Sequence, residues 1–138
     1  MNKLLRITMV LAVVLYLSAC ATGSVNIPEN LSPSELIQRA QEASDRNRYN
    51  LALQYYQALL ERNQTNIDLI CAAEYEIAFV YYKQKKYAQA REGFNALLER
   101  YNTPDEAYLP PQFKLLAIKV LERISEKEKP RSFFSRRR

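Results

Sequence analysis

The chain has 138 residues, of which 48% are hydrophobic and 25% charged, and its formal net charge is +5. This length suits one domain rather than several. The sequence contains no histidine, which excludes imidazole-based acid–base catalysis and imidazole metal ligands, and its two glycines exclude a glycine-rich phosphate loop. We therefore expect a protein that is not an enzyme and that needs no cofactor and no metal.

The first nineteen residues have the layout of a secretory signal peptide. Lys3 and Arg6 form a basic start, and residues 7–17 (ITMVLAVVLYL) form an apolar core. A permanent membrane-spanning helix needs about 20 apolar residues, so this run is too short to be one. We predict that residues 1–19 are a signal and not part of the folded domain.

The apolar run ends in Leu17-Ser18-Ala19-Cys20. This stretch resembles the lipobox of bacterial lipoproteins, which implies a diacylglyceryl group on the Cys20 thiol, cleavage just before it and acylation of the new amino terminus, with palmitate as a typical chain. Ala21 stands where an aspartate commonly marks inner-membrane retention. The resemblance therefore implies the periplasmic face of the outer membrane. The alternative is an ordinary signal peptide that happens to end in Ala-Cys.

Residues 20–32 are small and polar, with one Gly and one Pro, and show no sustained periodicity. This composition predicts a flexible tether after the lipidated cysteine. A tether of this size holds a domain roughly 20 Å from its anchor. The domain is therefore expected to work near a membrane surface.

The folded domain is predicted to span residues 33–128. Ser32 is a suitable helix cap, Pro33 suits the first helical position, and Glu35 completes a capping box. The first helix is predicted over residues 33–46.

Helical spacing of apolar residues continues to residue 128, with no strand alternation. It predicts helices over residues 49–62, 67–84, 87–101 and 111–128, with Thr65 or Asn66 capping the third. Thr103-Pro104-Asp105-Glu106 repeats the capping-box pattern for a short turn. The fold class is therefore predicted to be all-α.

Two of these helices are nearly the same sequence. Residues 48–62 and 86–100 are identical at seven of fifteen positions, thirty-eight residues apart. Each copy follows another helix, so the repeated unit is a helix pair. Because one pair cannot bury both of its faces, stacked pairs form a shared core.

The repeated unit resembles the tetratricopeptide repeat. The stretch IAFVYYKQKKYAQAREGF, residues 77–94, matches the family pattern at five positions: Ala78, Tyr81, Tyr87, Ala90 and Phe94. Lys85 and Lys86 replace the usual Gly-Asp, and the period is thirty-eight rather than thirty-four. The resemblance implies antiparallel helix-hairpin repeats, two in number, with the last helix as a C-terminal cap.

The resemblance also implies a concave surface formed by the first helix of each pair. Its residues would form a partner-binding groove: Ile37, Gln41, Asp45, Tyr75, Phe79, Tyr82 and Lys83. Three of them, Tyr75, Phe79 and Tyr82, share one helical stripe. Tyrosine provides contact area together with a hydrogen bond, which suits a groove for a peptide or helix. Alternatively, the last helix packs across this stripe and makes it core.

Other chemically active side chains have ordinary explanations. Cys71 is the thiol left after processing and lies in an apolar helical stretch, which predicts a buried, inert side chain. Glu74 and Glu76 do not face each other along a helix, so we expect solvated or ion-paired carboxylates rather than a catalytic pair.

The last residues, 129–138, are basic and are predicted to form a disordered tail. Together with aromatic residues, the arginines suit an anionic membrane or an acidic surface. The candidate residues are Arg131, Phe133, Phe134, Arg136, Arg137 and Arg138. A solvated end without a partner is the alternative.

Taken together, the sequence indicates a membrane-anchored lipoprotein with tetratricopeptide-like repeats. It is similar in type to lipoproteins that assemble outer-membrane barrels or pilot secretins, so we expect an interaction adaptor for envelope proteins or peptides. An exported protein is not expected to bind nucleic acid. The alternative function is a periplasmic binding module or transporter subunit that holds a ligand or substrate protein.

Overall fold

In a computed structural model, which describes residues 25–129, the chain is all-helical and this part contains no strand. The helices are α2 (Pro33–Asp45), α3 (Tyr49–Arg62), α4 (Ile67–Lys83), α5 (Tyr87–Arg100) and α6 (Pro111–Glu128), with a short 3₁₀ helix, η1 (Pro104–Tyr108), before α6. The prediction of an all-α fold is confirmed. The predicted helix bounds differ from these by at most one residue.

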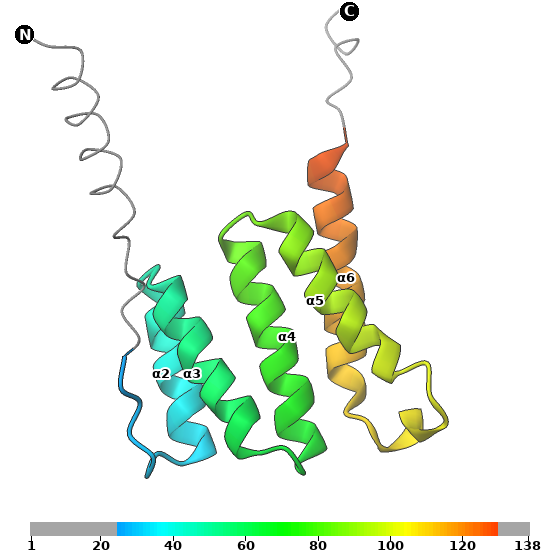
Figure 1. The fold of residues 1–138 in the computed structure, drawn as a ribbon. Helices are drawn as coiled ribbons and strands as arrows, with labels where there is room; N and C mark the ends of the chain where they lie inside the picture. Colours follow the sequence, from blue (N-terminus) through cyan, green and yellow to red (C-terminus); the bar gives the residue numbers. More distant parts are fainter. Residues whose placement is uncertain (1–24, 130–138) are drawn as a thin grey trace, which may run out of the picture.

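The helices form two hairpins, α2–α3 and α4–α5, followed by α6 (Figure 1). Helix α3 packs against α4, and α6 packs against both α5 and α4. Helices α2, α4 and α6 run in one direction and α3 and α5 in the other, so α2, α4 and α6 finish at the same end of the molecule. The predicted succession of helix pairs closed by a final helix is the observed arrangement.

The start of α2 follows the predicted capping box. The Ser32 backbone N–H donates to the Glu35 carboxylate (2.8 Å), and the Glu35 N–H donates to Ser32 Oγ (3.3 Å). Asn66 caps α4 by accepting from the Leu69 N–H (3.2 Å). The capping box predicted at Thr103 is wrong, because that hydroxyl donates backwards to the Arg100 carbonyl (2.8 Å) and does not cap η1.

Residues 25–32, which the prediction placed in a flexible tether over residues 20–32, pack against the domain. The Val25 N–H donates to the Gln54 side-chain oxygen (2.8 Å), and Arg62 donates to the carbonyl of Pro28 (2.9 Å) and to those of its two neighbours. From Val25 onwards the chain therefore lies against the first hairpin, and Arg62, near the C-terminus of α3, fastens it there.

The two hairpins close in the same way. The Arg48 N–H donates to the Ala43 carbonyl (2.8 Å), and thirty-eight residues later the Lys86 N–H donates to the Tyr81 carbonyl (3.0 Å). The sequence repeat is therefore also a repeat of backbone geometry.

Small residues set the distance between paired helices. Ala40, Ala52, Ala78 and Ala90 are fully buried where the helices of each pair meet. At Gly93 on α5, an added Cβ would lie 2.9 Å from the Ala78 Cβ, closer than carbon atoms approach. The α4–α5 contact is thus filled to the limit, and nothing larger fits there.

A leucine at this contact is expected to separate α4 from α5. We predict that Ala78→Leu lowers the free energy of unfolding by about 3 kcal/mol through overpacking. Ala88→Leu, on the exposed face of α5, is the matched control and should leave stability nearly unchanged. Thermal or urea unfolding of both variants tests this, and equal stability for the two would contradict the packing described.

Candidate functional site

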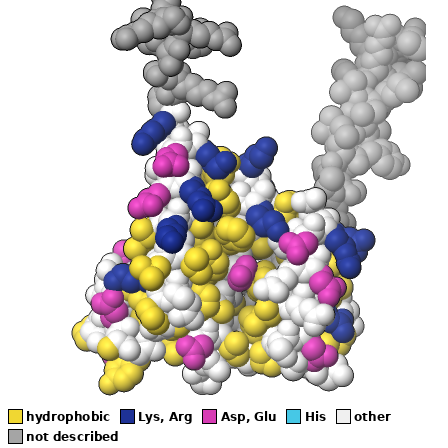
Figure 2. Space-filling model, turned by 180° about the vertical axis from the view of Figure 1, so that it is seen from behind, with side chains coloured by type: hydrophobic (Ala, Val, Ile, Leu, Met, Phe, Trp, Pro, Cys, Tyr) yellow, Lys and Arg dark blue, Asp and Glu magenta, His cyan; other side chains and the backbone are white. Residues whose placement is uncertain are grey.

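The face formed by α2, α4 and α6 is the candidate site. In the view from behind, hydrophobic side chains gather over the middle of this face, and Lys and Arg gather over its upper part (Figure 2). The upper part is the end at which α2, α4 and α6 finish. The face therefore changes from apolar to basic along the helix axes.

The predicted aromatic stripe on α4 is present. The rings of Tyr75 and Phe79 lie 5.9 Å apart and nearly parallel, and those of Phe79 and Tyr82 lie 5.6 Å apart. Offset stacking at these distances stabilises the ring positions. The stripe is therefore a fixed surface rather than a set of independent side chains.

Tyr75 does not offer its ring to a partner. It is only 7% exposed, and its ring lies 5.5 Å from that of Phe94 and 5.8 Å from that of Phe113 on α6. Its assignment to the groove is thus corrected, because α6 covers this end of the stripe. Phe79 and Tyr82, farther along α4, remain half-buried. The stripe is therefore core at Tyr75, under α6, and partly exposed surface at Phe79 and Tyr82.

Beyond the covered part, an open hollow of about 610 Å³ lies between the end of α4 and the last turns of α6, and we call it the α4–α6 groove. It is lined by Tyr82, Arg123, Glu126, Lys127 and Lys129. Three cations and one carboxylate beside an aromatic ring favour a ligand that carries negative charge and an apolar group.

The α6 residues of this groove did not enter the sequence-based prediction. Arg123 and Lys127 are one helical turn apart, so a basic stripe was visible in the sequence. What was missing was the position of α6, which the prediction treated as a cap. Its packing against α4 and α5 turns the stripe towards Tyr82.

The predicted α2 residues border the same face. Lys83 on α4 forms an ion pair with Asp45 on α2 (3.1 Å), and Asp45 remains 78% exposed. Gln41 is also exposed, whereas Ile37 is half-buried against the core of the first hairpin. Gln41 and Asp45 are therefore accessible to a partner, and Ile37 mainly supports packing.

The remaining candidates have structural roles. Arg100 donates two hydrogen bonds to the Glu74 carboxylate (2.7 and 2.6 Å), which confirms the expected surface ion pair. Glu76 differs from the expectation, since partial burial raises its pKa against the opposing effect of the Tyr56 hydroxyl. Cys71 is fully buried and burial raises its pKa, so it is the inert thiol that was predicted.

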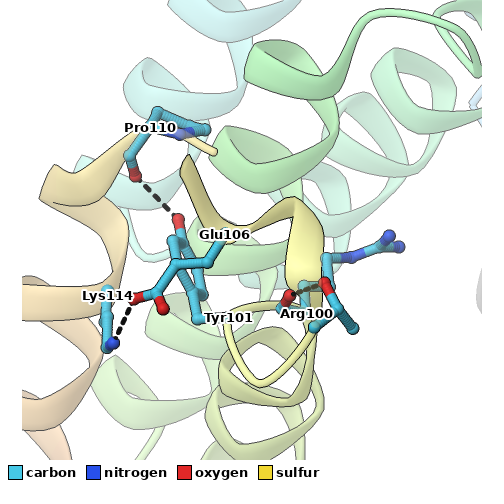
Figure 3. Close-up of polar contacts among 6 residues, drawn as sticks. Arg100, Tyr101, Glu106, Pro110 and Lys114 are labelled. Atoms are coloured by element: carbon cyan, nitrogen blue, oxygen red, sulfur yellow. Dashed lines mark hydrogen bonds and ion pairs between the residues drawn. The ribbon is translucent and has the colours of Figure 1, made fainter. Parts of the chain in front are cut away.

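Helix α6 forms one wall of the groove, and a small polar cluster sets its start (Figure 3). The buried Tyr101 hydroxyl at the end of α5 donates to the Pro110 carbonyl (2.7 Å), directly before α6. Lys114 in the first turn of α6 donates to Glu106 in η1 (2.5 Å). Burial raises the pKa of Tyr101 to about 12, so its hydroxyl keeps its proton and remains a donor at physiological pH.

Two predicted sites lie outside the described residues: the lipidation site Cys20 and, apart from Lys129, the basic tail of residues 129–138. Within residues 25–129, no helix is long and apolar enough to cross a membrane.

Comparison with known proteins gives one informative match. The chain is 34% identical over 113 residues to an uncharacterized protein of Treponema pallidum (strain Nichols). The match covers 80% of this chain but 45% of that protein, so the chain spans less than half the length of its relative. No family model and no solved structure matches.

The Tyr101 hydrogen bond provides a test of how α6 is held. Tyr101→Phe removes the donor and leaves a buried carbonyl unpaired, so we expect a loss of about 1–3 kcal/mol in unfolding free energy. Tyr108→Phe removes the same group from a ring that is 80% exposed and should have no measurable effect. Urea unfolding of both variants measures this difference. Equal losses of unfolding free energy would show that the hydrogen bond to Pro110 does not hold α6 in place.

Proposed function

We propose that this protein is a lipid-anchored adaptor that holds another envelope protein against its α2–α4–α6 face, at the periplasmic side of the outer membrane. The observation that carries the proposal is the open α4–α6 groove, with a fixed aromatic edge and a basic lining. The proposed role is non-enzymatic assistance in assembling an envelope complex, of the barrel-assembly or secretin type.

We further propose that the helix pairs are tetratricopeptide-like repeats. Three observations support this: hairpins thirty-eight residues apart with matching closing hydrogen bonds, buried alanines at the contacts within both pairs, and a final helix packed on the last pair. In such a stack the first helix of each pair forms one face. Here the first helices are α2 and α4, and the final helix α6 extends the face that they form.

The shape of the site favours an adaptor over the alternative of a periplasmic binding module. A ligand-binding module needs an enclosed, mainly apolar cavity. Here Tyr75, Phe94 and Phe113 fill the space under α6, and the hollow beside them is open with a charged lining. An open edge with a few accessible side chains suits a segment of another protein.

Lipid anchoring is testable through the two cysteines. We expect cells that express the full chain to incorporate labelled palmitate into the wild type and into Cys71→Ser, but not into Cys20→Ser. Cys71→Ser is the matched control because it removes a thiol that is buried in the fold. Labelling that persists in Cys20→Ser would refute the proposed anchor.

Partner binding is testable with surface variants of the full chain. We expect the wild type to recover a defined set of envelope proteins from detergent-solubilised membranes. Gln41→Glu combined with Tyr82→Ala should reduce that recovery at least tenfold, because the substitutions remove an aromatic contact and add a negative charge that repels an anionic partner from the same face.

Tyr108→Ala is the control for that experiment, since it removes an exposed tyrosine outside the face. All variants should melt at the wild-type temperature before they are compared. Recovery that is unchanged in the double variant, or lost equally in the control, would show that this face is not the binding surface.

A further inference from the structure

The end of the molecule at which α2, α4 and α6 finish is strongly basic. It consists of the turn at 46–48, the turn at 84–86 and the end of α6 at 127–129. We call it the basic end, and its cations are Arg46, Arg48, Lys85, Lys86, Lys127 and Lys129. The only carboxylate in these three segments is that of Glu128, which is paired with Arg91.

The opposite end has the opposite charge. It consists of residues 28–32, 63–66 and 101–110. These segments carry three carboxylates, Glu29, Asp105 and Glu106, and no basic residue. The domain therefore has an electrical polarity along its helix axes, with the basic end uppermost in Figure 2.

Helix dipoles explain only part of this polarity. Lys83 and Lys127 lie in the last turns of α4 and α6, where a cation is favourable. Arg48 and Lys86, however, occupy the N-cap positions of α3 and α5 and make no side-chain capping bond. A cation there opposes the helix dipole and displaces the usual Ser, Thr, Asp or Asn.

Lys85 is unfavourable for a second reason. Its φ is 61°, the left-handed region in which Gly or Asn is normally found, and the equivalent residue of the first hairpin is Asn47, with φ 58°. Lys86 gains one local contact, since its Nζ lies 5.9 Å from the centre of the Tyr81 ring. Within residues 25–129, Lys85 makes no such contact with an aromatic ring. Cations at two N-caps and at a left-handed turn position all go against local stability, and such departures are expected at functional surfaces.

The described part of the chain begins close to this end of the domain. The Val25 N–H is hydrogen-bonded to the Gln54 side chain. Gln54 is five residues beyond the start of α3 at the basic end, which is about 7.5 Å along the helix axis at 1.5 Å per residue. Cys20 is five residues further back, a reach of about 17 Å when extended. Residues 31 to 25 run towards the basic end, so the anchor can lie level with it.

We propose that the basic end of the domain rests against the anionic lipid surface of the membrane to which the chain is anchored. This inference rests on the proposed lipid anchor. It adds an orientation: the helices stand upright on the membrane, and the α4–α6 groove opens sideways with its basic part nearest the lipid. Of the nearby carboxylates, Glu42 and Asp45 are paired with Arg46 and Lys83, and Glu126 lies in the groove beside Arg123, Lys127 and Lys129, so cations outnumber carboxylates at this end.

The test uses the processed chain, residues 20–138, with Cys20→Ser so that no lipid contributes. Binding to vesicles that contain phosphatidylglycerol is compared with binding to pure phosphatidylcholine vesicles, at low and high salt. We expect the chain to bind the anionic vesicles preferentially and to lose this binding as salt screens the charges. Because no lipid is attached, failure of palmitate labelling at Cys20 and failure here are separate results.

The decisive variant is Lys85→Asn with Lys86→Asp. It supplies the residue types that the turn and the N-cap prefer, so its melting temperature should equal or exceed that of the wild type. Its affinity for anionic vesicles should fall at least about thirtyfold, from the loss of two surface cations. Greater stability with weaker binding is not expected of a purely structural role.

The matched control is Lys119→Gln with Arg39→Glu, which changes net charge equally at exposed positions within α6 and α2. It should retain most of the binding. Three results would overturn the proposal: no preference of the parent chain for anionic vesicles, undiminished binding by the Lys85–Lys86 variant, or an equal loss in the control. Undiminished binding by the Lys85–Lys86 variant would assign binding to the basic tail. No preference of the parent chain for anionic vesicles would leave an acidic protein as the partner of the basic end.

Discussion

The close contact between paired helices is the constraint on which the rest of this structure depends. Ala78 and Gly93 leave no room for one more carbon atom between α4 and α5. Around this contact α4 contributes side chains to two cores, with Tyr75 in the core shared with α5 and α6, and Ile77 and Val80 in the core shared with the first hairpin. The first hairpin meets the same requirement with Ala40 and Ala52. Stacking, and with it the existence of a continuous α2–α4–α6 face, follows from this spacing.

That face combines rigidity with an open edge. Tyr75 is fixed among aromatic rings from α5 and α6, and it holds Phe79 and Tyr82 in a stacked row. A partner would therefore meet side chains that lose little freedom on binding, which lowers the entropic cost of association. The proposed adaptor function depends on this preorganisation more than on the size of the groove.

Charge is organised on a larger scale than single ion pairs. The exposed pairs, such as Lys83 with Asp45, contribute little to stability individually. The separation of basic and acidic ends instead produces a field along the domain, and such fields orient a protein relative to a charged surface. Orientation at a membrane would present the groove in a fixed direction to other envelope proteins. The proposed partner-binding groove and the proposed membrane-facing basic end are thus different surfaces of the same domain.

The sequence alone determined the helices, the cap at Ser32, the pairing of helices and the burial of Cys71, and it narrowed the cap of α4 to Thr65 or Asn66. These features depend on the spacing of apolar residues within each helix and on a repeated segment, and both can be read directly from the sequence. Tertiary structure alone decided the fate of the aromatic stripe, because whether Tyr75 is surface or core depends on where α6 packs. It likewise decided that residues from 25 onwards lie against α3, and that Arg123 and Lys127 face Tyr82. Contacts between segments distant in sequence leave no periodic pattern, so only the folded chain reveals them.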